Sequence, residues 1–186
     1  MTNKTLPIRQ LRGSIVAENR FVRVRLDDIE FNNKQSGTHF VIEEPSGGAV
    51  VVVRNQAQQY YLHEAFHYAA QRWFSEFIRG YAESNELLAA AAIRELAEEA
   101  GFAYSVTEAP QCIGYVFANA TLLSNRVPVF MVCVESGDST IPAEQNEGLR
   151  NGRFVNMQQL LGMIASGEIE DGFTLSAVSM ILASDS

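Results

Sequence analysis

Two short patterns in this chain combine residue types that bind metal ions and transfer protons. Residues 63–67 read HEAFH and match H-E-x-x-H, in which two histidines bind zinc and the glutamate is a general base. Residues 94–99 read RELAEE and contain Glu95, Glu98 and Glu99. On a helix, spacings of three and four residues bring side chains together, so the second pattern predicts a cluster of carboxylates.

The carboxylate cluster would repel itself at neutral pH unless a cation lay among its members. Ligand sets made of oxygen alone suit hard ions, so the cluster predicts Mg²⁺ or Mn²⁺. A bare glutamate pair on a helix is more often a solvated acidic face, and this alternative stays open on these residues alone. The two interpretations differ in what surrounds the glutamates.

The residues around the glutamates predict a helix over 86–100, ELLAAAAIRELAEEA. At 100° per residue, its apolar positions fall in one stripe that we expect to face the core. The stripe consists of Ala89, Ala92, Ile93, Leu96 and Ala100. Glu99 lies off this stripe, so we expect its replacement to change folding little. Gly101 fits a left-handed position after the helix, and Ser84 or Asn85 can cap its start.

The HEAFH pattern lies among strand signals. Residues 49–54 (AVVVVR) predict a strand covered on both faces, and residues 60–62 (YYL) predict its partner strand after a polar turn. The zinc-protease chemistry needs a helix, because only there do histidines four residues apart meet around one ion. We therefore expect no zinc at His63 and His67, and we interpret HEAFH as a coincidental string at a strand end.

The rest of the chain predicts further strands and two C-terminal helices. A polar turn, NNKQSG, separates strand candidates 21–31 and 38–44, which favours a β-hairpin. Pro128 restricts its strand to an edge or bulged position. Asn156 and Gly167 are typical of the start and the end of a helix. The other predicted elements are strands 111–117, 126–134 and 152–155 and helices 157–166 and 174–183.

Composition bounds the class of protein. The 186 residues are 47% hydrophobic and 19% charged, which predicts one packed domain, with room for an appended subdomain. A formal net charge of −8 without a basic run argues against a nucleic-acid partner. Cys112 and Cys133 lie in apolar runs without C-x-x-C spacing, so we expect buried free thiols in a reducing compartment. Without a secretory apolar region or a run of about 18 apolar residues, we expect a cytoplasmic protein and no membrane contact.

The longer stretch GYAESNELLAAAAIRELAEEAGF, residues 80–102, resembles the Nudix box G-x5-E-x7-R-E-U-x-E-E-x-G-U, where U is bulky and apolar. The matching positions are Gly80, Glu86, Arg94, Glu95, Leu96, Glu98, Glu99, Gly101 and Phe102. A match of this length arises by chance far less often than H-E-x-x-H. The chain is also similar outside the box to one branch of the Nudix hydrolases, the ADP-ribose pyrophosphatases and nucleoside diphosphate sugar hydrolases. The similarity lies in the order of the strands, in QRWFSEFIRG before the box and in SGEIEDGFTLSAVSMIL near the end.

The resemblance implies an α+β fold with two parts. Residues 47–186 would form the Nudix α/β/α sandwich with a mixed sheet. Residues 1–46 would form a small antiparallel β-subdomain, here the predicted hairpin, which in this branch often builds a homodimer. A two-stranded hairpin is too small to be stable alone, so it should pack on a second subunit or on the Nudix domain. We expect a homodimer.

The resemblance also assigns metal ligands. Glu95 and Glu99 would be the principal ligands, and Glu98 would be a further ligand or the catalytic base that positions water. The backbone carbonyl of Arg79 would be an extra ligand, because Gly80 lets this loop approach the helix and the substrate closely. These ligands would hold Mg²⁺ or Mn²⁺.

Further catalytic roles fall on Arg94 and on the loop 143–155. Arg94 would pair with a box carboxylate and orient it, and an exposed helix salt bridge is the alternative. In the loop, Glu147 would be a catalytic metal ligand. Relatives often carry a catalytic glutamate where this chain has Gln145, so neighbouring Glu144 becomes the candidate for that role. Ordinary loop acids are the alternative interpretation of Glu144 and Glu147.

Departures from the family affect the substrate side. Relatives commonly have Gln-x-Arg where this chain has residues 65–67, so His67 would meet substrate phosphate with an imidazole in place of a guanidinium. Arg72, Trp73 and Glu76 match an R-W-x-x-E pattern before the box. Arg72 and Glu76 would contact substrate, whereas Trp73 is either a substrate contact or part of the core.

The resemblance therefore implies a hydrolase dependent on Mg²⁺ or Mn²⁺. It would cut the diphosphate of ADP-ribose or a related nucleoside diphosphate sugar into a nucleoside monophosphate and a sugar phosphate. A diphosphate linkage is negatively charged and repels hydroxide, so its hydrolysis needs cations. A catalytically idle Nudix module that senses a nucleotide is the alternative, motivated by His67 and Gln145.

Overall fold

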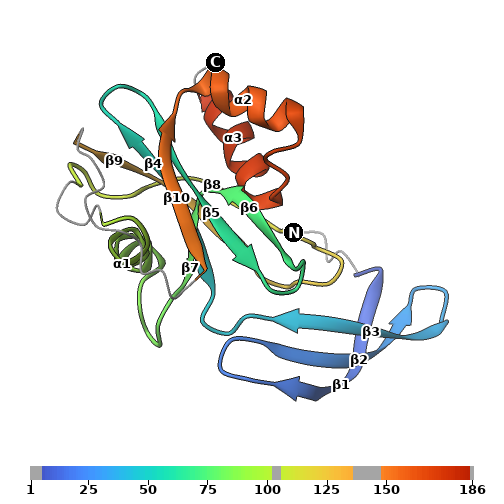
Figure 1. The fold of residues 1–186 in the computed structure, drawn as a ribbon. Helices are drawn as coiled ribbons and strands as arrows, with labels where there is room; N and C mark the ends of the chain where they lie inside the picture. Colours follow the sequence, from blue (N-terminus) through green and yellow to red (C-terminus); the bar gives the residue numbers. More distant parts are fainter. Residues whose placement is uncertain (1–5, 102–105, 136–147, 185–186) are drawn as a thin grey trace. The chain divides into compact units, whose positions relative to one another are not determined.

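The computed structural model describes residues 6–101, 106–135 and 148–184, and the chain divides into two compact units (Figure 1). The smaller unit comprises the residues up to Ser46 together with Asn119–Asn125. The larger unit comprises Gly47–Ala118 and Arg126–Ser186. Each unit has a sheet of its own. Among the described residues, no helix is both long enough and apolar enough to cross a membrane.

The smaller unit is a three-stranded antiparallel sheet in the order β1-β2-β3. Its strands are Ile8–Glu18 (β1), Arg23–Phe31 (β2) and Ser36–Glu43 (β3). The predicted hairpin corresponds to β2 and β3, and it lacked β1. The pairing of β1 with β2 shifts register twice, between Gln10 and Arg12 and between Ile15 and Ala17, so the alternation of its side chains is broken. A strand with a broken alternation gives no clear periodic signal in the sequence.

Residues 119–125 join the smaller unit through β3. The backbone N–H of Ile42 donates to the carbonyl of Leu122 at 2.8 Å, and the N–H of Ser124 donates to the carbonyl of Ile42 at 3.0 Å. The Asn125 side chain accepts from the N–H of Glu44 at 2.8 Å. This segment therefore extends the smaller sheet from a distant part of the sequence.

The larger unit contains a seven-stranded mixed sheet. Its strands are Gly48–Asn55 (β4), Tyr60–His67 (β5), Arg72–Glu76 (β6), Ile78–Tyr81 (β7), Gln111–Val116 (β8), Val127–Val134 (β9) and Leu149–Val155 (β10). The order is β10-β5-β4-β9-β8, with β6 beside β5 and β7 beside β4. Strands β4 and β9 are parallel, and the other pairs are antiparallel.

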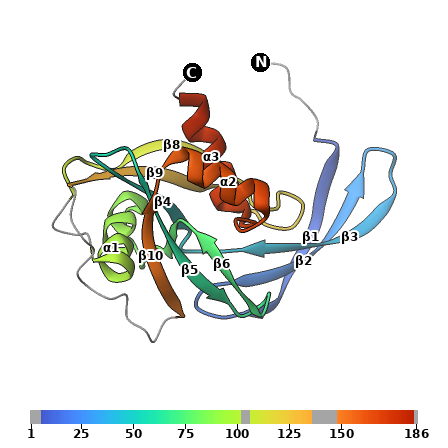
Figure 2. The same cartoon turned by 45° about the horizontal axis from the view of Figure 1, so that its top comes forward.

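The sheet of the larger unit is covered on both faces, as its valine-rich strand predicts. Residues Val50 to Val53 of β4 are all 0% exposed, and they alternate between two apolar clusters. Val51 and Val53 belong to the cluster with α1 (Leu88–Ala100), and Val50 and Val52 belong to the cluster with α2 (Met157–Ser166) and α3 (Gly172–Ser184). Burial of each valine side chain contributes about 1.5–3 kcal/mol. Figure 2 shows α1 on one side of the sheet and the two C-terminal helices on the other, so the predicted α/β/α sandwich with a mixed sheet is confirmed.

Helix α1 follows the predicted stripe but starts differently. Ala92, Leu96 and Ala100 are buried against the sheet, with the other two stripe residues partly buried beside them. The N-cap is Leu87, which makes no side-chain capping bond, so the predicted caps at Ser84 and Asn85 are wrong. The carboxylate of Glu86 accepts instead from the N–H of Glu83 at 2.8 Å and pairs with Arg94. Gly101 ends the helix with φ 71°, as predicted.

The two C-terminal helices confirm the predicted boundaries closely. Asn156 forms a capping box with Gln159 at the start of α2, and Gly167 ends this helix with φ 77°. Helix α3 starts two residues before the predicted position, and Asp171 accepts from the N–H of Thr174 at 2.8 Å. These local side-chain signals are therefore sufficient to position both helices.

Two expectations need correction, one about the strand that contains Pro128 and one about the burial of the cysteines. Pro128 was predicted to lie in an edge or a bulged strand; β9 runs between β4 and β8, so the edge is excluded, and the pair of β9 with β8 does shift register near Pro128. The irregularity lies in the partner strand, between Cys112 and Gly114. Both cysteines are free thiols as predicted, but Cys112 is exposed and Cys133 is half-buried.

Candidate active site

Strand β7, which precedes α1, approaches the helix so closely at Gly80 that this position requires glycine. A Cβ atom at Gly80, in β7, would lie 1.9 Å from Cδ and 2.0 Å from Cγ of Glu95. Contacts below about 3 Å are not tolerated between carbon atoms, so any larger residue would displace the Glu95 side chain. The absence of a side chain at Gly80 therefore lets the backbone of β7 lie against Glu95 of the helix.

Arg94 binds the carboxylates of the box together. It donates from Nε to Glu86 at 3.1 Å, and from Nη1 to Glu95 at 2.8 Å and to Glu98 at 3.0 Å. Nη2 donates to the carbonyl of Tyr81 at 2.8 Å and to Glu86 at 3.0 Å. The hydrogen bond to Glu86 and those to its other acidic partners raise the pKa of Arg94, and Arg94 in turn lowers the pKa of Glu86. The expected pairing of Arg94 with a box carboxylate is present, and it extends to three of them.

The three glutamates of α1 differ in their environment. The Glu98 side chain is 55% exposed and that of Glu95 is 14% exposed, whereas Glu99 is a buried residue. The expectation that Glu99 lies away from the core is therefore wrong. Its Oε2 atom lies 3.8 Å from Nδ1 of His63 on β5, so the helix carries this carboxylate toward the sheet.

His63 is the other buried polar group beside the helix. It is 3% exposed, and neither ring nitrogen has a hydrogen-bond partner within the parts of the chain that the structure describes. Burial lowers the pKa of His63 to about 4, with smaller contributions from the charges of Arg79 and His67. The imidazole is therefore neutral at neutral pH.

The residues of the box have the donor chemistry of a site for a hard divalent cation. Carboxylate oxygens and a backbone carbonyl are the ligands that Mg²⁺ and Mn²⁺ prefer. Within the described ranges, no three side chains of His, Cys, Asp or Glu converge as a metal-binding group. Glu95 and Glu98 are instead each paired with Arg94. The buried polar groups of His63 and Glu99 and the glycine-dependent approach at Gly80 nevertheless fit such an ion.

A second polar cluster surrounds Glu76, at the end of β6. Nε2 of His67 lies 2.6 Å from Glu76 and 2.9 Å from Nη2 of Arg79. Arg79 also lies 3.2 Å from Glu76 and 3.9 Å from Asp171, and its guanidinium lies 5.0 Å from the ring centre of Phe173. One nitrogen atom cannot accept from Arg79 and donate to Glu76 together, so Nε2 can hydrogen-bond to only one of them at a time.

Glu76 is 3% exposed, and burial raises its pKa although Arg79 and His67 act in the opposite direction. We consider burial the larger effect, because a carboxylate with so little solvent contact loses most of its hydration. The expected substrate contact at Glu76 would thus act through the two basic residues that it holds. Both of these side chains are partly exposed.

The other expected substrate residues lie beside this cluster. Arg72 pairs with Glu170, and its guanidinium lies 4.7 Å from the ring centre of Phe74. Trp73 is half-buried, 5.6 Å from the ring of Phe66, and the guanidinium of Arg150 lies 3.8 Å from its ring centre. Trp73 thus packs against both Phe66 and Arg150 while it stays half-buried, so both alternatives, substrate contact and core residue, remain.

Several expected site residues lie outside the described part of the chain. They are Glu144 and Glu147 of the loop, the intervening Gln145, and the box residue Phe102. Their assigned roles remain predictions from the resemblance.

The HEAFH pattern lies on a strand, as predicted. His63 and His67 are both in β5, where an even spacing directs side chains to the same face but about 13 Å apart along the strand. Their contacts are accordingly different, since His63 lies beside Glu99 and His67 beside Glu76. The even spacing of the two histidines in a strand could have predicted that His63 lies on the same face of β5 as His67.

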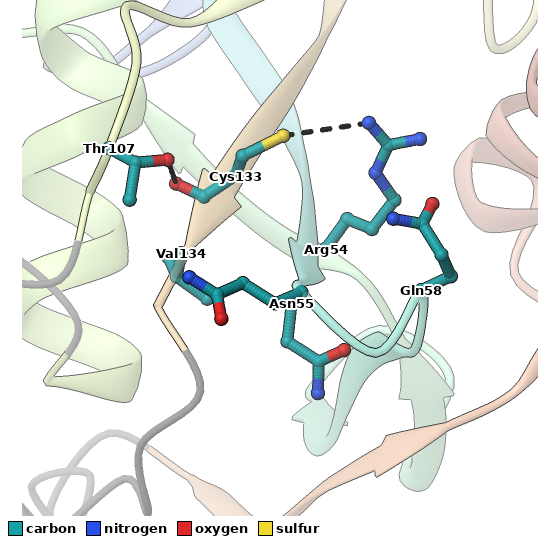
Figure 3. Close-up of a pocket in the computed structure, with 7 residues that line it drawn as sticks. Arg54, Asn55, Gln58, Thr107, Cys133 and Val134 are labelled. Atoms are coloured by element: carbon teal, nitrogen blue, oxygen red, sulfur yellow. Dashed lines mark hydrogen bonds between the residues drawn. The ribbon is translucent and has the colours of Figure 1, made fainter.

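A separate hollow of about 280 Å³ lies at the far end of β4 (Figure 3). Its lining comprises Arg54, Asn55, Gln56, Gln58, Thr107, Cys133 and Val134. Nη2 of Arg54 lies 3.6 Å from the sulfur of Cys133. This lining shares no residue with the box, so we do not place the chemistry of the box there.

Comparisons with known proteins agree with this geometry. A family model described as NUDIX domain matches residues 43–172. A solved structure titled "Crystal structure of ADP compounds hydrolase" has a TM-score of 0.74 and 17% sequence identity, and the match covers 96% of this chain and 94% of that chain. At this identity the likeness shows the fold alone. No curated protein matches the chain.

Proposed function

The chain belongs to the NUDIX domain family, which comprises pyrophosphohydrolases of acid anhydride bonds, and we propose that it hydrolyses the diphosphate of a nucleoside diphosphate sugar. ADP-ribose is the first candidate, with a nucleoside monophosphate and a sugar phosphate as products. The observation that carries the proposal is the array in which Arg94 binds three box carboxylates while Gly80 closes on Glu95. The solved hydrolase of ADP compounds with a similar fold supports the choice of substrate class.

Members of the family typically use a divalent metal, and we assign Mg²⁺ or Mn²⁺ to this chain. Glu95, Glu98 and Glu99 would hold it, together with the carbonyl of Arg79 and with Glu147 of the loop. A bound divalent cation would screen the charge of the diphosphate and make water easier to deprotonate.

The side chains around the box would bind and orient the reactants. Arg94 holds the side chains of Glu95 and Glu98 in fixed orientations, so less conformational entropy is lost when substrate binds. Glu98 is exposed enough to meet a water molecule and accept its proton, which is the role of general base. Arg79 and His67 present positive or hydrogen-bonding groups, held by the buried Glu76, to the negatively charged substrate.

A panel of nucleoside diphosphate sugars incubated with Mg²⁺ tests this function. We expect turnover of at least one member, detected as phosphate released from the products by an added phosphatase. ADP-ribose should be cut to AMP and ribose phosphate. Tight binding of a panel member without turnover would instead identify the chain as a nucleotide-sensing module.

We also propose that the smaller unit forms a homodimer interface. Its described strands expose several large apolar side chains, each at least 38% accessible. They are Ile8, Leu11, Ile15, Val16, Phe31 and Phe40. Soluble monomers rarely expose large contiguous apolar patches, and a three-stranded sheet gains stability when its open face is covered. A second copy of the same sheet is an occupant of matching chemistry.

Light scattering over a range of concentrations should give the mass of a dimer for the unmodified protein. Ile15→Asp is expected to shift the mass toward a monomer, because it places a charge on the sheet face that Ile15 shares with Ile8 and Phe31. Leu161→Asp, at an exposed site of α2 in the other unit, is the matched control and should leave the mass unchanged. A monomer mass at every concentration would remove the proposal.

A further inference from the structure

His63 is a buried side chain to which the proposed reaction assigns no role. Both of its ring nitrogens lack a hydrogen-bond partner in the described ranges, although the residue is 97% buried. A buried polar group without a partner is destabilising, and most buried polar atoms in proteins are hydrogen-bonded. An apolar residue would fill the same position at lower cost, so a ligand of the imidazole would explain its presence.

The imidazole is directed toward the glutamates of α1. Nδ1 of His63 lies 3.8 Å from Oε2 of Glu99, too far for a hydrogen bond and close enough for both atoms to bind one ion. Ligation uses the lone pair of a ring nitrogen, and neither ring nitrogen of His63 is engaged by a hydrogen bond within the described ranges. His67, on the same strand, is instead engaged with Glu76 and Arg79.

We propose that His63 is a nitrogen ligand of the divalent cation at Glu99. The inference rests on the proposed metal-dependent function, and it adds a nitrogen atom from the sheet to oxygen ligands from the helix. Imidazole favours transition-metal ions over Mg²⁺, which prefers oxygen. The site should therefore bind Mn²⁺ in preference to Mg²⁺.

Pulsed electron paramagnetic resonance of the Mn²⁺-loaded protein, prepared without a histidine tag, tests this contact directly. We expect nitrogen modulation of the Mn²⁺ signal in the unmodified protein, because an imidazole nitrogen would be bound to the ion. The modulation should disappear in His63→Gln. It should persist in His67→Gln and in His39→Gln, which remove the other histidines of the chain.

Metal affinity gives a second readout that does not depend on catalysis. By titration calorimetry, His63→Gln should weaken Mn²⁺ binding at least about tenfold, the lower end of what loss of a supporting group costs. Mg²⁺ binding should weaken less than about threefold. A preference for Mn²⁺ over Mg²⁺ should accordingly shrink in the variant.

The possible results separate this inference from the proposed function. One result would overturn only the role of His63: the unmodified protein binds Mn²⁺, Glu99→Gln weakens this binding, and the Mn²⁺ signal shows no nitrogen modulation. If the nitrogen modulation is lost in His67→Gln and kept in His63→Gln, the nitrogen ligand is His67 and the role proposed for His63 is overturned. If the unmodified protein binds no divalent cation, both the inference and the proposed metal site are overturned.

Discussion

Glu99→Gln should lower kcat at least about a hundredfold, as expected when a ligand of a catalytic metal is lost. Glutamine has nearly the shape of glutamate, so the substitution removes the charge and keeps the volume. Because Glu99 is buried beside His63, its replacement should also have a small effect on the free energy of unfolding. We expect the Tm to change by less than about 4 °C, which corresponds to about 1 kcal/mol in a chain of this size.

The measurement compares kcat and thermal unfolding of the variant with those of the unmodified protein. Glu108→Gln, at an exposed position outside the helix, removes a charge of the same kind and should change neither quantity. Nearly normal turnover of Glu99→Gln would show that this carboxylate is not a ligand. Loss of turnover that coincides with unfolding would assign Glu99 a structural role.

Much of the larger unit follows from sequence periodicity. The valine run of β4 predicts burial on both faces, and its residues do alternate between two clusters. The apolar stripe of α1 predicts the side that meets the sheet. Asn156 and Gly167 predict both ends of α2, because capping depends on residues close in sequence. Local signals were reliable wherever the structure depends on local chemistry.

The missed elements depend on partners far away in the sequence. Strands β6 and β7 are short, and each is defined by pairing with a longer strand, β5 or β4. The segment 119–125 is joined to the smaller unit by hydrogen bonds to β3, about 80 residues earlier. Strand β1 has a broken register. Pairing of this kind cannot be seen in a single stretch of sequence.

The candidate site shows the same division. The family resemblance implied that Arg94 pairs with a box carboxylate, and one of its partners, Glu98, lies four residues on, where helix geometry brings side chains together. It could not predict that Glu99 is buried, since that depends on residues far away in the sequence, such as His63 of β5. The helical wheel placed Glu99 off the apolar stripe, and a buried histidine opposite it made a polar contact on the core side.

Gly80→Ala should also lower kcat about a hundredfold, with a smaller effect on stability. The added methyl group would lie 1.9 Å from Cδ of Glu95, and both atoms cannot occupy their present positions. Misplacement of a catalytic group by about 1 Å can cost about a hundredfold in rate. Gly162→Ala is the matched control, because that glycine lies in α2 with nothing within 4 Å of its would-be Cβ. The control should keep its activity and gain about 0.5–1 kcal/mol of stability.

A double substitution tests whether the collision with Glu95 is the cause. Glu95→Ala removes the atoms that the new methyl group would meet, and it should itself lower kcat because a proposed ligand is lost. In that background, Gly80→Ala should lower neither kcat nor the free energy of unfolding further, since two residues that act through one contact are not additive. A second, independent drop in kcat would show that Gly80 is required for something other than its approach to Glu95, such as close contact of the backbone with substrate.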